Sequence, residues 1–121
     1  MKTLDEATKW LIKNSNSELR LDCDYGSSGM WSNQGENLSR NLLEFSPELS
    51  NRITAWQKDF DDTLVFNNFE AEELWWDAHF VERNSIALEL QKVFGEQIKV
   101  VVWDGNFWKT IKSLLTPDVT Q

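Results

Sequence analysis

Residues 98–103, Ile-Lys-Val-Val-Val-Trp, form the stretch that decides the fold. Their side chains are mostly β-branched and are apolar on both faces of an extended chain, which is typical of a central strand with neighbours on each side. Asp104-Gly105 follows directly and predicts a two-residue hairpin turn, with residues 107–111 as the returning strand. The segment therefore predicts a β-hairpin within a small sheet.

A short C-terminal helix before Pro117 is a second interpretation of the same region. The apolar residues that also fit helical spacing are Phe107, Ile111, Leu114 and Leu115. We favour the hairpin because the strand over residues 98–103 needs a partner. Both interpretations stay open for residues 106–115.

A second strand is predicted upstream, where apolar and polar residues alternate over residues 19–25. Gly26-Ser27-Ser28-Gly29 ends it as a tight turn. Residues 30–40 are mostly polar and predict a loop, or a loop that holds one short strand.

Helices are predicted where apolar residues recur at helical spacing, over residues 4–13, 46–64 and 70–94. Ser46-Pro47-Glu48 is a typical helix start, with serine as the N-cap and proline in the first turn. Gly95 is a typical helix end.

The longest of these helices has its own predicted core seam. The seam consists of Leu74, Ala78, Val81 and Leu88, extended by Ile86, Leu90 and Phe94. Asn84-Ser85 marks a point where the helix could bend or divide in two.

These elements predict one α+β domain over residues 1–121, with helices packed on one face of a small, mainly antiparallel sheet. A chain of 121 residues has room for one domain, and its seven Trp and seven Phe supply much of the burial. Residues 117–121 are expected to form a frayed tail.

The overall charge excludes several function classes. The chain has 12 basic and 20 acidic residues and a formal net charge of −8 at pH 7. Such a surface is unsuited to the phosphates of nucleic acids and to anionic membranes, so we expect neither as a partner. No apolar run is long enough to span a bilayer, and Asp5-Glu6 stand where a signal peptide would be apolar. With Cys23 as the single cysteine, a cytoplasmic location is expected.

Candidate catalytic residues are few, and we predict no catalytic residue, no metal and no cofactor. His79 is the single histidine and has no second histidine to complete a metal site. Residues 26–29 lack the lysine of a phosphate-binding loop and the spacing of a nucleophile elbow. Asp22 and Asp24, on one face of the predicted strand, leave a small cation-binding hydrolase as a minor alternative.

The net charge is concentrated in residues 59–82. This segment has eight acidic residues and neither Lys nor Arg, while the other 12 acidic residues of the chain balance its 12 basic ones. It also carries five aromatic rings, on Phe66, Phe69, Trp75, Trp76 and Phe80, besides Phe60 within the preceding helix. Because adjacent Trp75 and Trp76 point about 100° apart on a helix, at least one of them is expected near the surface.

Exposed aromatic rings surrounded by one sign of charge are typical of a protein-binding surface. The predicted partner-binding residues are Asp59, Asp61, Asp62, Phe69, Glu70, Glu72, Glu73, Trp76, Asp77 and Glu82. The competing interpretation is an ordinary solvated helix face whose tryptophans both reach the core.

The segment Asp24-Tyr-Gly-Ser-Ser-Gly-Met-Trp31, followed by Leu49, Arg52, Ile53 and Trp56, resembles small acidic bacterial immunity proteins of contact-dependent inhibition and related polymorphic toxin systems. The resemblance covers residues 19–62 and carries no functional residues over. It implies that the protein binds a cognate toxin domain and covers its active site. The Asp24–Trp31 segment itself is interpreted as a structural corner in which glycines allow positive φ and Trp31 packs.

The resemblance and the charge agree, because a toxin that cuts nucleic acid needs a basic cleft that an acidic domain can occupy. We therefore expect a non-catalytic inhibitor of a basic, nuclease-like toxin, acting as a monomer or weak homodimer. A cytosolic adaptor that binds another protein is the alternative.

Overall fold

The computed structural model describes residues 2–63 and 69–115 and confirms the predicted α+β class. The helices are α1 (Leu4–Asn14), α2 (Pro47–Thr63), α3 (Phe69–Phe94) and α4 (Ile111–Leu115), the strands are β1 (Glu18–Leu21), β2 (Met30–Trp31), β3 (Lys99–Trp103) and β4 (Trp108–Thr110), and the 3-10 turns are η1 (Arg40–Leu43) and η2 (Gly95–Gln97). The predicted frayed tail at 117–121 and the ring of Phe66 lie outside the described residues.

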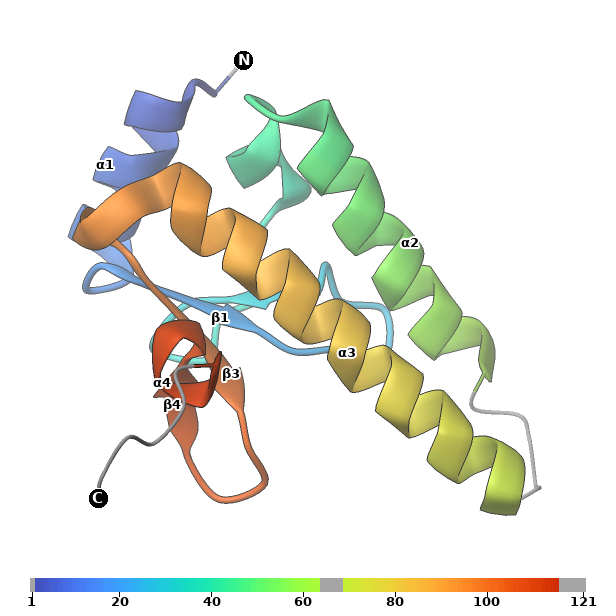
Figure 1. Cartoon of the computed structure of the whole chain (residues 1–121). Helices are drawn as coiled ribbons and strands as arrows, with labels where there is room; N and C mark the ends of the chain where they lie inside the picture. The colour runs from blue at the N-terminus through green and yellow to red at the C-terminus, as the bar shows by residue number, and fades with distance from the viewer. Residues whose placement is uncertain (1, 64–68, 116–121) are drawn as a thin grey trace, which may run out of the picture.

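The sheet has the order β2-β1-β3-β4, so β3 is a central strand, as predicted. The β1–β2 and β3–β4 pairs are antiparallel, which confirms a mainly antiparallel sheet. The central pair, β1 with β3, is parallel, with Glu18 opposite Lys99 and Leu21 opposite Val102. The hydrophobic pattern did not predict this pairing. It places β1 next to a strand from the far end of the chain, as Figure 1 shows.

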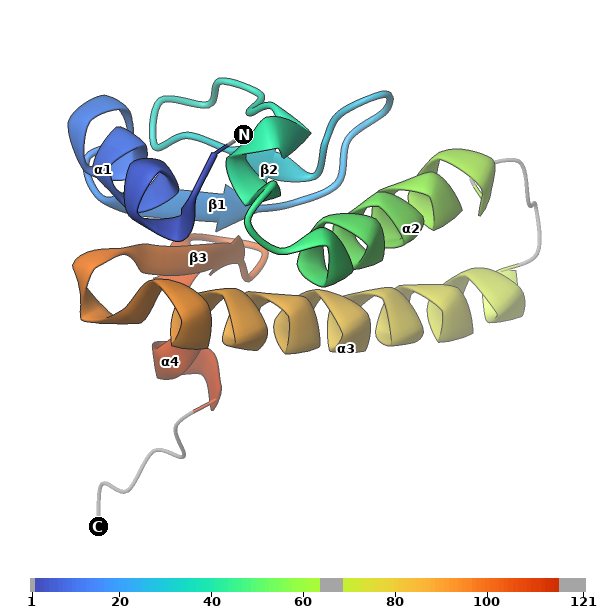
Figure 2. The same ribbon diagram turned by 90° about the horizontal axis from the view of Figure 1, so that it is seen from above.

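The core lies between the sheet and the helices. Alternate residues of the central strands supply its sheet side: Leu19, Leu21, Val100 and Val102. The helices supply the other side, including Leu11 of α1, Ile53 of α2, and Ile86 and Leu90 of α3, all 1 % exposed or less. Figures 1 and 2 both show α3 returning beside α2.

Local sequence signals explain the helix ends. The Thr3 hydroxyl accepts from the Glu6 backbone N–H and the Glu6 carboxylate accepts from the Thr3 N–H, which forms a capping box at the start of α1. Gly95 has φ of +72° directly after α3, where an L side chain would be strained. Asn84-Ser85 neither ends nor divides α3, which is continuous through it.

The predicted strand over residues 19–25 is wrong beyond Leu21, where β1 ends. The backbone after this point turns through Gly26 and Gly29. The Asp24 N–H donates to the Ser27 hydroxyl and the Asp24 carbonyl accepts from the Gln57 side chain, in place of a neighbouring strand. Asp22 and Asp24 therefore do not share a strand face.

The predicted two-residue turn at Asp104-Gly105 is also wrong. Trp103 pairs with Trp108, so the hairpin loop is four residues long, and the Asp104 carboxylate accepts from the N–H groups of Asn106 and Phe107. The hairpin and the short C-terminal helix are both confirmed in part. The returning strand β4 is formed, and α4 follows it directly.

The predicted core seam of α3 is wrong in its first half. Leu74 is 72 % exposed and Val81 70 % exposed, and Ala78 is exposed between them. The buried residues in this half are instead His79 and Arg83. The helix has apolar residues around most of its circumference, so spacing alone could not identify the buried side.

Candidate functional site

A network of hydrogen bonds holds the loop of residues 24–29 against α2. The buried Gln57 side chain donates to the Asp24 carbonyl at 2.7 Å and accepts from the Ser27 hydroxyl at 2.9 Å. Asp61 accepts from Gln57 Nε2 at 3.0 Å and from the Gly26 N–H at 3.1 Å. The Asp24–Trp31 segment is thus a structural corner, as predicted, and Asp61 helps to hold it.

Three more of the predicted acidic residues also have protein partners. Asp59 accepts from the Trp75 indole N–H at 2.8 Å, and Asp62 pairs with Lys58 one helical turn earlier. The Glu82 carboxylate accepts two hydrogen bonds from the Arg52 guanidinium, one from Nε at 3.0 Å and one from Nη2 at 2.9 Å. These bonds link α3 to α2. The bases Lys58 and Arg52 lie outside the acidic segment in sequence but next to it in the fold.

Two acidic residues of α3 remain directed to solvent. Glu73 and Asp77 are exposed and form no ion pair within residues 2–63 and 69–115. They lie one helical turn apart and flank the exposed stripe of Leu74, Ala78 and Val81. The backbone of Phe69, Glu70 and Glu72 is part of α3, and their side chains lie outside the described part of the chain.

An aromatic cluster joins the middle of α3 to α2. The His79 ring is stacked between the indoles of Trp56 and Trp75, at centroid distances of 4.8 and 4.7 Å and interplanar angles of 18° and 21°. Trp76 meets the same ring edge-on at 5.4 Å. Trp75 and Trp76 are both half-buried, so the predicted position near the surface holds for each of them.

This environment keeps His79 neutral. Burial lowers the pKa of His79 to about 4, and the nearby Arg83 cation adds to the decrease. Among the described residues, its buried Nδ1 has no hydrogen-bond partner. The sequence left a solvated or a packing role for His79, and the stacked rings show that it packs.

Sequence reasoning missed Tyr25, which extends the aromatic surface. Tyr25 is 65 % exposed, and its ring contacts that of Phe60 at 5.5 Å. The fold brings it, with the exposed Asp24, to the acidic end of α2. The apolar position of Tyr25 in an alternating pattern wrongly indicated the core.

A cavity of about 530 Å³ opens between α3, the loop after β1 and the β3–β4 hairpin. The charged groups in its wall include Asp22 and the buried Arg83. The Arg83 guanidinium donates to the Trp103 carbonyl at 2.8 Å and to the Asn84 amide oxygen at 3.1 and 2.9 Å, and it stacks on Phe80. Arg83 directly follows the acidic segment in sequence, but nothing in the sequence pattern predicted this cavity.

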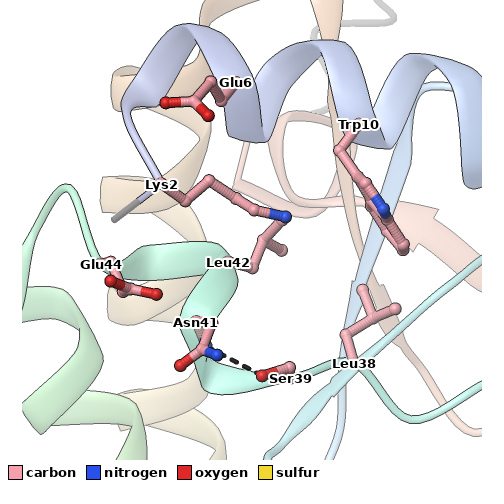
Figure 3. A pocket seen from close by; sticks show the side chains of 8 residues that line it. All are labelled: Lys2, Glu6, Trp10, Leu38, Ser39, Asn41, Leu42 and Glu44. Carbon is pink, nitrogen blue, oxygen red and sulfur yellow. Dashed lines mark hydrogen bonds between the residues drawn. The ribbon is translucent and has the colours of Figure 1, made fainter.

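A second hollow, of about 450 Å³, lies between α1 and η1. Figure 3 shows Lys2, Glu6 and Trp10 on one side of it and Ser39 and Asn41 on the other. Its polar groups are already used locally: Glu6 and Ser39 cap α1 and η1, and the Lys2 ammonium lies 5.3 Å from the Trp10 ring centroid.

Nothing in the described ranges forms a metal-binding cluster of three or more His, Cys, Asp or Glu residues. Burial raises the pKa of the Cys23 thiol well above its usual range, so it is not an activated nucleophile. No helix of the described ranges is both long and apolar enough to cross a membrane.

Comparison with known proteins agrees with the resemblance noted from residues 19–62. No curated protein matches the chain. A protein-family model described as Serratia CdiI immunity protein-like matches residues 17–105, which is well over half of the chain and includes the whole α2–α3 region. The chain therefore belongs to the Serratia CdiI immunity protein-like family.

Proposed function

We propose that this protein neutralises a cognate toxin domain by binding over a basic active-site cleft, with the outer face of α3 as the centre of its binding surface. Family membership supports the immunity role. The observation that carries the surface assignment is the exposed apolar stripe of Leu74, Ala78 and Val81, flanked by Glu73 and Asp77.

This composition is suited to a fast, tight inhibitor. Apolar side chains that become buried on binding supply affinity, and a largely exposed Leu or Val contributes little to the fold itself. Glu73 and Asp77, which form no ion pair in the described part of the chain, remain available for attraction of a basic partner and raise the association rate. Inhibition by covering a cleft requires no catalytic group on the inhibitor.

The direct test is isothermal calorimetry between this protein and the protein encoded immediately upstream, tested as the cognate toxin. We expect binding at micromolar concentration or tighter, together with loss of toxin activity at one equivalent. Absence of binding at micromolar concentration would overturn the proposal.

Truncation of the stripe tests the surface assignment. The double substitution Leu74→Ser and Val81→Ser is expected to weaken toxin binding by about tenfold or more, because each side chain loses on the order of 1 kcal/mol of interface burial. The melting temperature should change little, since both side chains are exposed in the free protein.

The matched control is Ile12→Ser, which removes an exposed apolar side chain from α1, a different helix from the one that carries the stripe. It should leave toxin affinity unchanged. Equal losses for the α1 and α3 variants would show that the stripe is not the binding surface.

A further inference from the structure

The cavity beside the β3–β4 hairpin has the features of a site for a cationic side chain. Its walls carry the rings of Phe60, Trp76, Phe80 and Trp103, which come from α2, α3 and β3. Phe80 and Trp103, at 39 % and 40 % exposed, stand at the opening. Aromatic faces attract cations through their quadrupoles, most strongly where water is partly excluded.

A carboxylate without an ion pair lies in the same wall. Asp22 is half-buried, and no cation lies within 4.0 Å of it among the described residues, because the Arg83 donors are directed to Trp103 and Asn84. Burial raises the pKa of Asp22. The Arg83 charge lowers this pKa, but by less than burial raises it. An incoming cation would stabilise the ionised form of Asp22.

Exposed carboxylates elsewhere on α3 also favour the approach of a cation. Glu73 and Asp77 lie on the side of α3 that carries Phe80, seven and three residues before it. Asp104 at the hairpin is already paired with Lys109 at 2.8 Å. His79 lines the cavity as a neutral ring, and among the described residues its buried Nδ1 has no hydrogen-bond partner.

We propose that this cavity receives an arginine side chain from the surface of the toxin, with the guanidinium paired to Asp22 and stacked against the aromatic walls. Arginine suits the site better than lysine, because its planar guanidinium stacks on rings and pairs with a carboxylate through two hydrogen bonds. This proposal rests on the proposed function, and adds to it one anchor residue and one chemistry of recognition.

The first experiment compares Asp22→Asn with Asp24→Asn in binding to the toxin domain. Both variants remove one negative charge, but Asp24 is exposed and lies outside the cavity. Asp22→Asn is expected to weaken binding by about tenfold or more, and Asp24→Asn by no more than about twofold. Equal effects of the two variants would overturn the cavity proposal. If in addition Leu74→Ser/Val81→Ser still weakened binding, the proposed function would stand.

The second experiment needs no toxin. Methylguanidinium is titrated into the wild-type protein and the indole N–H signals of Trp76 and Trp103 are followed by NMR, with sodium chloride at equal ionic strength as the reference. We expect saturable shifts at millimolar concentration that are weaker with methylammonium and absent in Asp22→Asn. Shifts that do not saturate, that persist in Asp22→Asn, or that are equal for the two cations would overturn the arginine assignment even if the toxin binds.

Discussion

Replacing Gly29 by valine is expected to lower the free energy of unfolding by about 2–4 kcal/mol, because the substitution is both strained and crowded. Gly29 has φ of +86°, and a Cβ there would lie 3.3 Å from Ile53 Cγ2 and 3.3 Å from Trp56 Cζ3. Both contacts are to buried side chains of α2, so the branched valine would push the loop away from the helix.

The matched control is Gly26→Val in the same turn. Gly26 has φ of +68°, and a Cβ there would meet nothing within 4 Å, so only the backbone strain of about 1–2 kcal/mol applies. Urea denaturation followed by tryptophan fluorescence measures both variants. Equal losses would contradict close packing of the Gly29 backbone against α2.

Acidification is expected to remove up to about 3 kcal/mol of stability through His79 alone. The pKa of His79 is lowered from 6.5 to about 4 in the folded protein, so the unfolded chain binds the proton more readily. The stabilising contribution is complete above pH 6.5, decreases as the pH falls below 6.5, and is lost as the pH reaches about 4. The cause is the cost of placing an imidazolium in a buried site beside the Arg83 cation.

The control for this prediction is His79→Phe, which keeps an aromatic ring between Trp56 and Trp75 but cannot bind a proton. Urea denaturation of both proteins between pH 7 and pH 4 gives the two pH profiles. Carboxylates contribute to both profiles, so the difference between them isolates His79. We expect the wild-type profile to fall more steeply, and parallel profiles would contradict a neutral, buried His79.

Elements with strong local signals could be predicted from the sequence. The helix start at Ser46-Pro47-Glu48, the helix end at Gly95 and the run of valines in β3 act within a few residues, so their effects were visible in the pattern. The parallel pairing of Glu18–Leu21 with Lys99–Val102 could not be predicted in this way, because it depends on how the intervening helices return the chain.

The buried face of α3 was misjudged for a related reason. Leu74 and Val81 have the composition of core residues, while His79 and Arg83 have that of surface residues. His79 is buried because two indoles stack on it, and Arg83 because Trp103, Asn84 and Phe80 surround its guanidinium. These partners lie on other elements or depend on the folded geometry, so hydrophobic spacing in one helix could not reveal them.

The sequence shows directly that acidic residues are concentrated in residues 59–82. In the fold, these acidic residues have different roles. Asp61 holds the loop at Gly26, and Glu82 is tied to Arg52. Charge changes at these two positions would disturb the fold along with any binding surface. Glu73 and Asp77 are exposed and form no ion pair in the described part of the chain, so they are the positions at which charge can be removed with the least structural effect.

The most direct test of the account is therefore the rate of association with the toxin domain, measured by stopped-flow fluorescence at low and high ionic strength. The variant Glu73→Gln/Asp77→Asn is compared with Glu36→Gln/Glu44→Gln, which changes the net charge equally in the segment between β2 and α2. We expect the α3 variant to associate about tenfold more slowly at low ionic strength and to lose most of its salt dependence, while the control stays within about twofold of wild type. Equal rates for the two variants would contradict a binding surface centred on the outer face of α3.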